Sequence, residues 1–187
     1  MIDFTLTDEQ RLLEQSVREW AAREVAPYIR ENDRKHHFDR DRILGGMAKL
    51  GLLGISVPQE YGGAGMDYIC LGLASEELEY VDTSLRVIMS VHAGLNCLSL
   101  LTWGTEDQKQ RYLVPQAQGT KIAGYGLTEP GAGSDARAIQ TTAVEEGRSV
   151  RAERREELDL AGRRRRSTSS SSPGPISRRR SSAIRPA

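Results

Sequence analysis

The run GYGLTEPGAGSD, residues 124–135, carries the clearest chemical signal in the sequence. Gly131 and Gly133 add no side chain to the backbone, so a ligand can approach the backbone closely there. The hydroxyls of Thr128 and Ser134, with the backbone amides around them, can hydrogen-bond a phosphate or the edge of a heteroaromatic ring. The spacing matches neither GxGxxG nor a Walker loop, so on spacing alone a plain polar turn is the commoner interpretation.

The other titratable residues lack the spacing of a catalytic or metal site. Cys70 and Cys97 are the only cysteines and lie in apolar, helix-like stretches, so we expect no disulfide and a reducing compartment. His36, His37 and His92 have no partner spacing and are expected on the surface or in helix packing. Four glutamates on helices and loop edges are expected to be solvated, and none is assigned as a catalytic base: Glu76, Glu77, Glu79 and Glu129.

Capping residues and apolar spacing predict a helical bundle as the scaffold. Thr7 followed by Gln10 makes a capping box, and apolar residues then recur at helical spacing until Pro27. Four further helices are expected on similar grounds, marked by Ile43 to Leu50 before Gly51, by Asp67 and Asp82 as N-caps, and by a second capping box at Thr105 and Gln108. Residues 1–116 are therefore expected to form an all-α amino-terminal domain.

The composition changes after Gly119 and changes again near residue 145. Residues 117–144 contain a short β-like run that breaks into glycines, which predicts the start of a β-rich domain. Apolar periodicity is lost over residues 145–187, and 16 of the last 28 residues are Arg or Ser. Such a segment cannot bury enough apolar surface to offset its ordering entropy, so we expect a disordered tail.

The charge balance differs between the body and the tail. The 26 basic and 26 acidic residues cancel, but residues 160–187 hold eight Arg and no Asp or Glu, which leaves 18 basic against 26 acidic residues in 1–159. A neutral chain argues against a nucleic-acid partner, whereas a basic arm is typical of one. The sequence has no signal or transit-peptide character and no apolar run of membrane-spanning length, so we expect a cytoplasmic protein with no membrane partner; the alternative is a cleaved organellar precursor.

Three separated motifs make the sequence resemble the acyl-CoA dehydrogenase family. They are the TDEQRLL start, GLLGISVPQEYGGAGM at 51–66, and LTEPGAGSD preceded by GTEDQKQRYLVPQAQGTKIAGYG. They occur in the family's order, and the resemblance covers residues 1–143. Members have an amino-terminal α domain, a central β domain and a carboxy-terminal four-helix domain, with FAD between them. The resemblance implies a mainly α fold: a helical bundle of that type, a truncated β-domain start and a disordered Arg/Ser tail.

The same resemblance implies a flavin site and a reaction. Tyr125, Leu127 and Thr128 would line the flavin ring, Gly133 and Ser134 would lie by the pyrophosphate of FAD, and Ser134 would also contact the acyl-CoA thioester. In the family a carboxylate removes the α proton while the β hydrogen leaves as hydride to the flavin. That carboxylate lies in the carboxy-terminal domain of most members, so we assign no catalytic base and expect an inactive fragment. The full-length family implies an electron-transfer flavoprotein or similar acceptor and a homotetramer.

Arg86 lies in VDTSLRVIMSVH, where the sequence most resembles the glutaryl-CoA dehydrogenase subgroup. There an Arg faces the far end of the substrate, and a guanidinium in an acyl pocket would pair with a terminal carboxylate. Arg86 would then be a substrate-binding residue for dicarboxylyl thioesters. The alternative is a helix-surface Arg whose stem covers apolar surface.

The Arg/Ser tail has two interpretations. It is either a basic arm on a non-enzymatic helical module that binds RNA or an acidic partner, or out-of-frame translation of the next family segment. A one-base shift over Arg148 to Arg164 permits DRYVLNGEKSWISLAD, and a two-base shift over Ser167 to Ala187 permits HFLVFAWTDLEKKIVRDPSG; both resemble the family. We therefore expect residues from about 145 onward to be a frameshifted product of a damaged gene or a sequence error.

Overall fold

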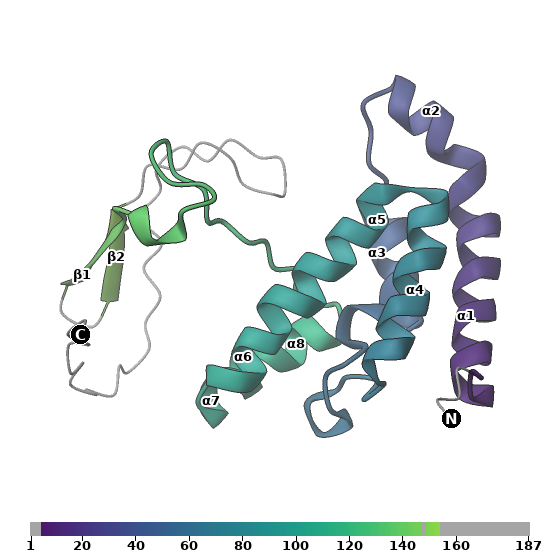
Figure 1. The fold of residues 1–187 in the computed structure, drawn as a ribbon, viewed down its shortest axis with the longest axis horizontal. Helices are drawn as coiled ribbons and strands as arrows, with labels where there is room; N and C mark the ends of the chain where they lie inside the picture. Colours follow the sequence, from purple (N-terminus) through teal and green to yellow (C-terminus); the bar gives the residue numbers. More distant parts are fainter. Residues whose placement is uncertain (1–4, 147–148, 154–187) are drawn as a thin grey trace. The chain divides into compact units, whose positions relative to one another are not determined.

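The computed structural model describes residues 5–146 and 149–153, and the chain forms two compact units, Met1–Tyr125 and Gly126–Ala187 (Figure 1). The first unit contains the α-helices α1 (Asp8–Trp20), α2 (Ile29–Arg34), α3 (Arg40–Lys49), α4 (Tyr68–Val81), α5 (Thr83–Met89), α6 (Leu98–Trp103), α7 (Glu106–Gln108) and α8 (Val114–Ala117). It also contains the π-helical segments η1 (Ala21–Val25), η5 (Ser90–Cys97) and η6 (Lys109–Leu113), and the 3-10 turns η2 (Ala26–Tyr28), η3 (Leu52–Gly54) and η4 (Gln59–Tyr61). The mainly α fold expected from the sequence is confirmed.

The predicted helix starts are formed. The Thr7 hydroxyl accepts a hydrogen bond from the Gln10 N–H (3.2 Å), the Gln10 side chain accepts one from the Thr7 N–H (3.0 Å), and the same reciprocal box forms at Thr105. The carboxylates of Asp67 and Asp82 accept from first-turn amides of α4 and α5. The π-helical segments lie inside predicted helices, but their π character was not predicted, because an apolar stripe of period 3.6 does not distinguish a local π turn from an α turn. The short helix α2 has no counterpart in the prediction.

Helices α1 and α4 lie side by side and run in the same direction (Figure 1). Near their starts the Gln10 amide donates to Asp67 (2.9 Å), and further along the Arg18 guanidinium binds both carboxylate oxygens of Glu77 (2.7 and 3.0 Å). Glu77 is consequently buried, with 9% of its surface exposed. The expectation that it is a solvated charge was wrong, because a paired and hydrogen-bonded carboxylate tolerates burial.

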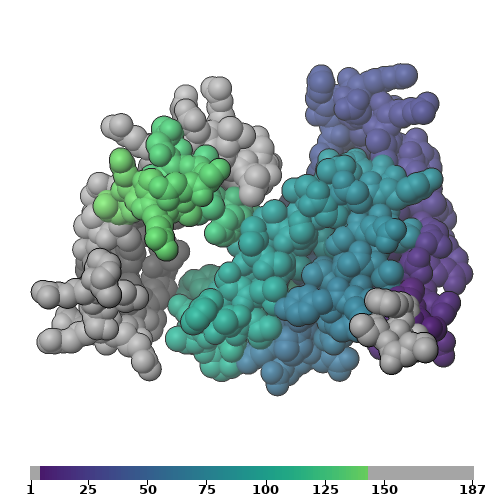
Figure 2. All heavy atoms as spheres, viewed as in Figure 1, coloured from purple at the N-terminus to yellow at the C-terminus, as the bar shows by residue number. Residues whose placement is uncertain are grey.

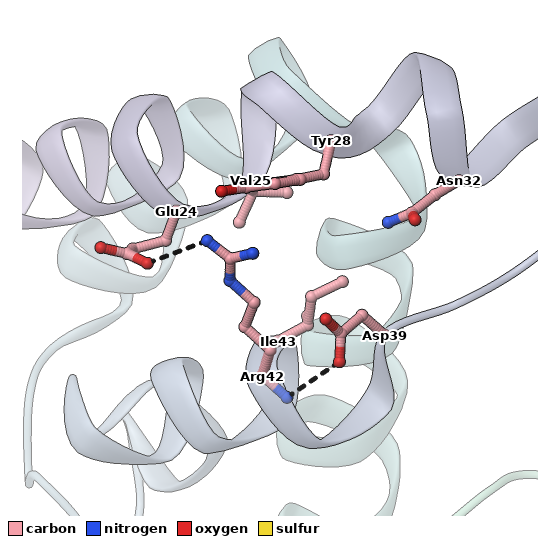
Figure 3. Close-up of a pocket in the computed structure, with 7 residues that line it drawn as sticks. All are labelled: Glu24, Val25, Tyr28, Asn32, Asp39, Arg42 and Ile43. Carbon is pink, nitrogen blue, oxygen red and sulfur yellow. Dashed lines mark hydrogen bonds and ion pairs between the residues drawn. The ribbon is translucent and has the colours of Figure 1, made fainter.

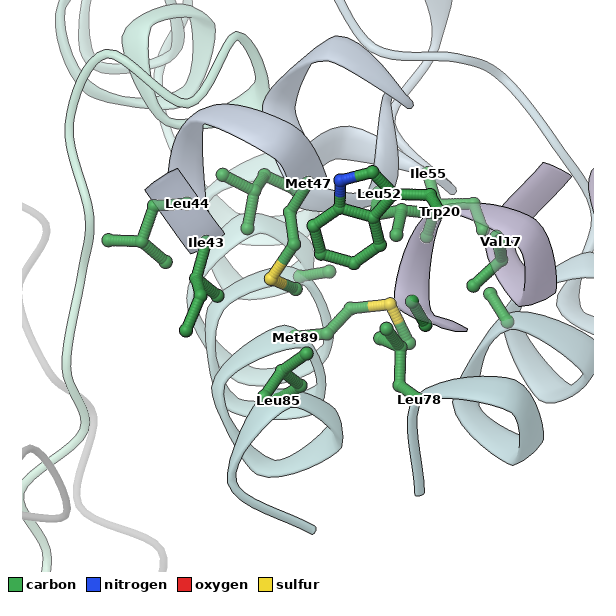
Figure 4. Packing of buried hydrophobic residues seen from close by; sticks show 14 of the residues in the cluster. Val17, Trp20, Ile43, Leu44, Met47, Leu52, Ile55, Leu78, Leu85 and Met89 are labelled. Carbon is green, nitrogen blue, oxygen red and sulfur yellow. The ribbon is translucent and has the colours of Figure 1, made fainter. Parts of the chain in front are cut away.

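The main core lies where α1, α3, α4 and α5 meet (Figure 4). Trp20 packs so closely on α3 that a Cβ at Gly46 would lie 2.5 Å from its indole ring. The helices therefore approach one another because position 46 has no side chain. The largest fully buried apolar residues of this core are Met47, Leu52, Leu53, Ile55, Leu78, Leu85, Met89 and Val17. In the space-filling view, helices α1 to α8 form one closely packed body, coloured purple to teal (Figure 2).

A smaller core holds α8 against the π-helical segments. It consists of Val57, Cys97, Leu113 and Ala117. A Cβ at Gly54 would lie 2.6 Å from the Ala117 carbonyl oxygen, so η3 and α8 are in direct backbone contact. This contact fixes α8, which leads directly into the candidate site.

α5, η5 and α6 join into one helix, Thr83–Trp103, of 21 residues. By length and composition it is apolar enough to cross a membrane, although polar residues such as Arg86, His92 and Asn96 interrupt it, so that the sequence shows no continuous apolar run of that length. Leu85, Met89 and Ala93 of this helix are buried in the bundle. The core helix of a helical bundle has the same length and composition, so we assign no membrane span to this one.

The described part of the second unit contains a loop, a short 3-10 turn, η7 (Ala136–Ala138), and an antiparallel hairpin of β1 (Thr142–Glu146) and β2 (Ser149–Glu153). The register pairs Thr142 with Glu153 and Glu146 with Ser149. The β-like run expected before this point forms no strand within the described residues 117–141, because a strand requires a partner ladder.

The hairpin also changes the expected boundary of the tail. Disorder was predicted from residue 145, but the structure extends β1 to Glu146 and pairs it with β2. The composition argument tests whether a segment can bury a core, whereas a hairpin ladder is made by local backbone hydrogen bonds. The remaining tail, residues 154–187, with its basic arm and most of the proposed frameshift, lies outside the described residues.

Candidate functional site

The chain segment that enters the candidate site belongs to the helical unit as far as Tyr125. The Lys121 N–H donates to the Pro115 carbonyl (3.0 Å), and the Thr120 hydroxyl donates to the same oxygen (2.9 Å). The Ala123 N–H donates to Nδ1 of His92 (3.1 Å). Residues 117–125, which the sequence assigned to the β domain, are therefore attached to the helices.

His92 is the residue of this region whose contacts sequence reasoning missed. It was expected on the surface or in helix packing, and the second alternative is confirmed, since its side chain is fully buried; its two hydrogen bonds were not predicted. Nε2 lies 3.0 Å from the Gln116 carbonyl oxygen while Nδ1 accepts from Ala123. Burial lowers the pKa of His92, so the ring is neutral with its proton on Nε2. No short-range spacing signals this role, because Ala123 lies 31 residues away.

The loop of the second unit is closed by Glu129. Its backbone exchanges two hydrogen bonds with Ala132 (2.8 and 3.1 Å). Its carboxylate accepts from the backbone amides of Gln140 (2.8 Å) and Thr141 (3.0 Å) and from the Thr141 hydroxyl. Glu129 is 8% exposed, so the expectation that it is solvated was wrong; amides 11 and 12 residues away replace its water.

The tip of this loop is open. A Cβ at Gly131 or Gly133 would meet no atom within 4 Å, and neither glycine has the left-handed backbone that would require glycine. A Cβ at Gly72 of α4 would also meet no atom within 4 Å, so the open tip allows a ligand to lie against the backbone but does not by itself identify one. Ser134 is exposed beside them, and the following residue, Asp135, accepts from the Arg137 N–H (3.0 Å) and starts η7.

The predicted site residues occupy both units. Tyr125 ends the helical unit and is half-buried, and Leu127 of the second unit is half-buried as well. Thr128, Gly133 and Ser134 are exposed. Over residues 5–146, the side chains of Tyr125, Thr128 and Ser134 make no hydrogen bond, so their hydroxyls can serve a ligand.

Arg86 lies on α5 and pairs with Glu79 of α4, with Nε 2.7 Å from Oε2. This hydrogen bond is the main cause that lowers the pKa of Glu79. The Arg86 side chain is 36% exposed. In this arrangement the guanidinium already has a carboxylate partner from its own chain.

A hollow lies between η1, η2 and α3 in the helical unit (Figure 3). The Arg42 side chain enters it, with its guanidinium carbon 3.9 Å from the centre of the Tyr28 ring and a nitrogen 3.2 Å from Glu24. The Asp39 carboxylate caps α3 by accepting from the Arg42 N–H (3.4 Å). These contacts join the segments that line the hollow. No cluster of metal-ligating side chains occurs among the described residues.

Comparisons with known proteins agree on one family. The sequence profile described as acyl-CoA dehydrogenase, N-terminal domain, matches residues 7–120. The short-chain-specific acyl-CoA dehydrogenase of Clostridium acetobutylicum is 49% identical over 147 residues, which are 78% of this chain and 38% of that protein.

Two solved structures share the fold. A chain from a study of the electron transferring flavoprotein of Acidaminococcus fermentans is 42% identical, with a TM-score of 0.77 over 81% of this chain and 40% of that one. An acyl-CoA dehydrogenase from Bacillus anthracis, complexed with FAD, is 31% identical, with a TM-score of 0.71 over 81% of this chain and 26% of that one. The chain thus spans less than half the length of the proteins it matches.

Proposed function

Because the chain belongs to the acyl-CoA dehydrogenase family, we propose that it supplies the helical domain and flavin-binding loop of an FAD-dependent dehydrogenase for short-chain acyl-CoA thioesters. The observation that carries this proposal is the likeness to the Bacillus anthracis acyl-CoA dehydrogenase complexed with FAD, which extends over 81% of this chain, and the backbone at Gly131 and Gly133 is open to such a ligand. An FAD pyrophosphate lying against this backbone accounts for both glycines.

The residues of the loop fit FAD chemically. The Ser134 hydroxyl and the amides beside Gly133 can donate to the pyrophosphate, and Thr128 can donate to a polar edge of the flavin ring. Tyr125 and Leu127 offer the apolar and aromatic surface on which a flat ring packs. FAD, when bound, supplies the acceptor for the β hydrogen of the substrate. The role of Tyr125, Leu127, Thr128, Gly133 and Ser134 in this proposal is to keep the acyl thioester aligned with the flavin ring. A misplacement of about 1 Å costs on the order of a hundredfold in rate.

We assign no catalytic base in this chain. Among the described residues two carboxylates are buried, and both have partners: Glu77 binds Arg18, and Glu129 accepts from Gln140 and Thr141. We therefore expect the chain by itself to dehydrogenate no acyl-CoA. The check is reduction of an artificial electron acceptor with butyryl-CoA, and a rate above a control of buffer plus free FAD would contradict this expectation.

For substrate and partners, the proposal follows the relatives. The Clostridium protein is named as short-chain specific, which favours an uncharged short acyl chain. A glutaryl thioester would require Arg86 to leave Glu79, its partner at 2.7 Å. The relation to the Acidaminococcus chain favours an electron-transferring flavoprotein as the acceptor. A cytoplasmic homotetramer completes the proposal for the full-length enzyme.

Titration of FAD with the purified chain tests the loop assignment. Quenching of flavin fluorescence should give saturable binding for the wild type, and Gly133→Ala should raise the Kd about tenfold or more, because the methyl occupies the pyrophosphate position. Gly72→Ala is the matched control, since a Cβ there also meets nothing within 4 Å but lies on α4. No saturable binding, or equal weakening in both variants, would overturn the proposal.

A further inference from the structure

We propose that His92 is a positioning residue that fixes the segment Ala123–Tyr125, and with it the ring of Tyr125. The inference rests on the proposed function in one respect, the assignment of Tyr125 to the flavin ring. The contacts of His92 themselves stand without that assignment.

The two ring nitrogens of His92 make different hydrogen bonds. Nε2–H donates to the Gln116 carbonyl on α8 at 3.0 Å, which fixes the orientation of the ring. That orientation leaves the Nδ1 lone pair facing the incoming segment, where it accepts the Ala123 N–H at 3.1 Å. Tyr125 follows two residues later, at most about 7 Å further along the chain. His92 therefore limits where Tyr125 can lie.

The anchor itself is rigid because several contacts hold Gln116. α8 is packed against η3, where a Cβ at Gly54 would lie 2.6 Å from the Ala117 carbonyl. The Cys97 thiol, also from η5, lies 4.0 Å from the side-chain oxygen of Gln116. Two residues of one π-helical segment thus contact Gln116, and π-helical turns are frequent at functional sites.

The alternative is that His92 is a packing residue whose shape alone matters. Other contacts already hold the two residues before this segment, because Ile122 packs against the main core and the Lys121 N–H donates to the Pro115 carbonyl. If shape were sufficient, the acceptor at Nδ1 would be dispensable. The two explanations therefore differ in what an acceptor at that one position contributes.

Three variants separate them. In His92→Asn the side-chain oxygen takes the place of Nδ1 and can still accept from Ala123, while the bond to Gln116 is lost. In His92→Gln the side-chain amide can reach the Gln116 carbonyl, but no acceptor remains at the Nδ1 position. His92→Leu keeps the apolar volume and removes both bonds. If the Leu variant does not fold, the Asn and Gln variants can still be compared with each other, and they differ in the acceptor at the Nδ1 position.

The experiment measures amide hydrogen exchange of residues 123–125 and FAD affinity in the wild type and all variants. We expect exchange at Ala123 and the Kd for FAD to rise about tenfold in His92→Gln and His92→Leu and to stay within about threefold of wild type in His92→Asn. Equal behaviour of the Asn and Gln variants would overturn the positioning role. Faster exchange with unchanged FAD affinity would overturn the link to Tyr125.

These outcomes are distinct from failure of the proposed function. If the wild-type chain binds no FAD, the flavin assignment fails, and exchange at Ala123 to Tyr125 still decides the role of His92. If FAD binds but exchange is the same in all variants, the flavin assignment stands and the anchor fails.

Discussion

The helical unit and the loop of the second unit are ordered by different interactions. In the helical unit four helices bury a shared apolar core, so many side chains contribute to one cooperative structure. In residues 126–141 one carboxylate, that of Glu129, accepts the hydrogen bonds that close the loop. The helical unit should therefore lose stability through cavities, whereas the loop of the second unit should lose its shape when a single acceptor is removed.

Leu78→Ala should give the largest effect and should act on the scaffold. Leu78 is fully buried between the helices, so removing its side chain leaves a cavity and lowers the free energy of unfolding by about 2–5 kcal/mol. Urea denaturation followed by circular dichroism measures this. Leu12, 67% exposed, provides the control: Leu12→Ala should change stability by less than about 0.5 kcal/mol. A comparable loss in both variants would show that the core is not where we place it.

Glu129→Ala should act on the loop alone. Three donors, two from Thr141 and one from Gln140, lose their acceptor, which should destabilise the closed loop by about 1–3 kcal/mol. Amide exchange at these two residues should accelerate while the unfolding midpoint of the helices stays unchanged. Glu129→Gln keeps one acceptor oxygen and should fall between. If Glu129→Ala also lowered the unfolding midpoint of the helices, the loop and the helical unit would not be stabilised separately, which would contradict this account.

Thr7→Ala tests a local signal at the start of the scaffold. It removes the hydroxyl that caps α1 and should lower the free energy of unfolding by about 1 kcal/mol. Thr7→Ser keeps the hydroxyl and should restore most of the loss. Denaturation of the two variants in parallel gives the comparison, and equal stability of both would mean that the capping box contributes nothing.

The smallest effect concerns pH. Burial lowers the pKa of His92, so the unfolded chain binds a proton below about pH 6.5 that the folded chain resists. The free energy of unfolding should therefore rise with pH up to about 6.5. In His92→Asn the contribution of His92 to this rise should be absent. The Cys97 thiol, whose pKa burial raises to about 12, stays protonated over this range. Identical slopes in wild type and variant between pH 5 and 7 would contradict a buried neutral His92.

Local signals in the sequence were the reliable ones. The N-caps at Thr7, Asp67 and Thr105 were predicted because donor and acceptor lie within three residues of one another. The buried carboxylates were not, because the partners of Glu77 and Glu129 lie 59 and 11 to 12 residues away. Burial of a charge depends on such distant partners, and residue type alone does not reveal them.

The residues of the candidate site also differ in whether the sequence alone could identify them. Gly131, Gly133 and Ser134 could be selected from the sequence because a glycine-rich run with hydroxyls has a direct chemical meaning. The contribution of His92 could not, since its two partners, Gln116 and Ala123, are brought to it only by packing of η5 and α8. Candidates for ligand contact can thus be selected from a local pattern, whereas candidates for positioning them require the fold.

The most direct test of the central claim is amide hydrogen exchange of the chain with and without FAD. If the open loop is the flavin site, FAD should slow exchange at Gly133, Ser134 and the amides near Thr128, while α1 exchanges at the same rate in both samples. Protection confined to the helices, or no change at residues 126–135, would contradict the assignment of this loop to FAD.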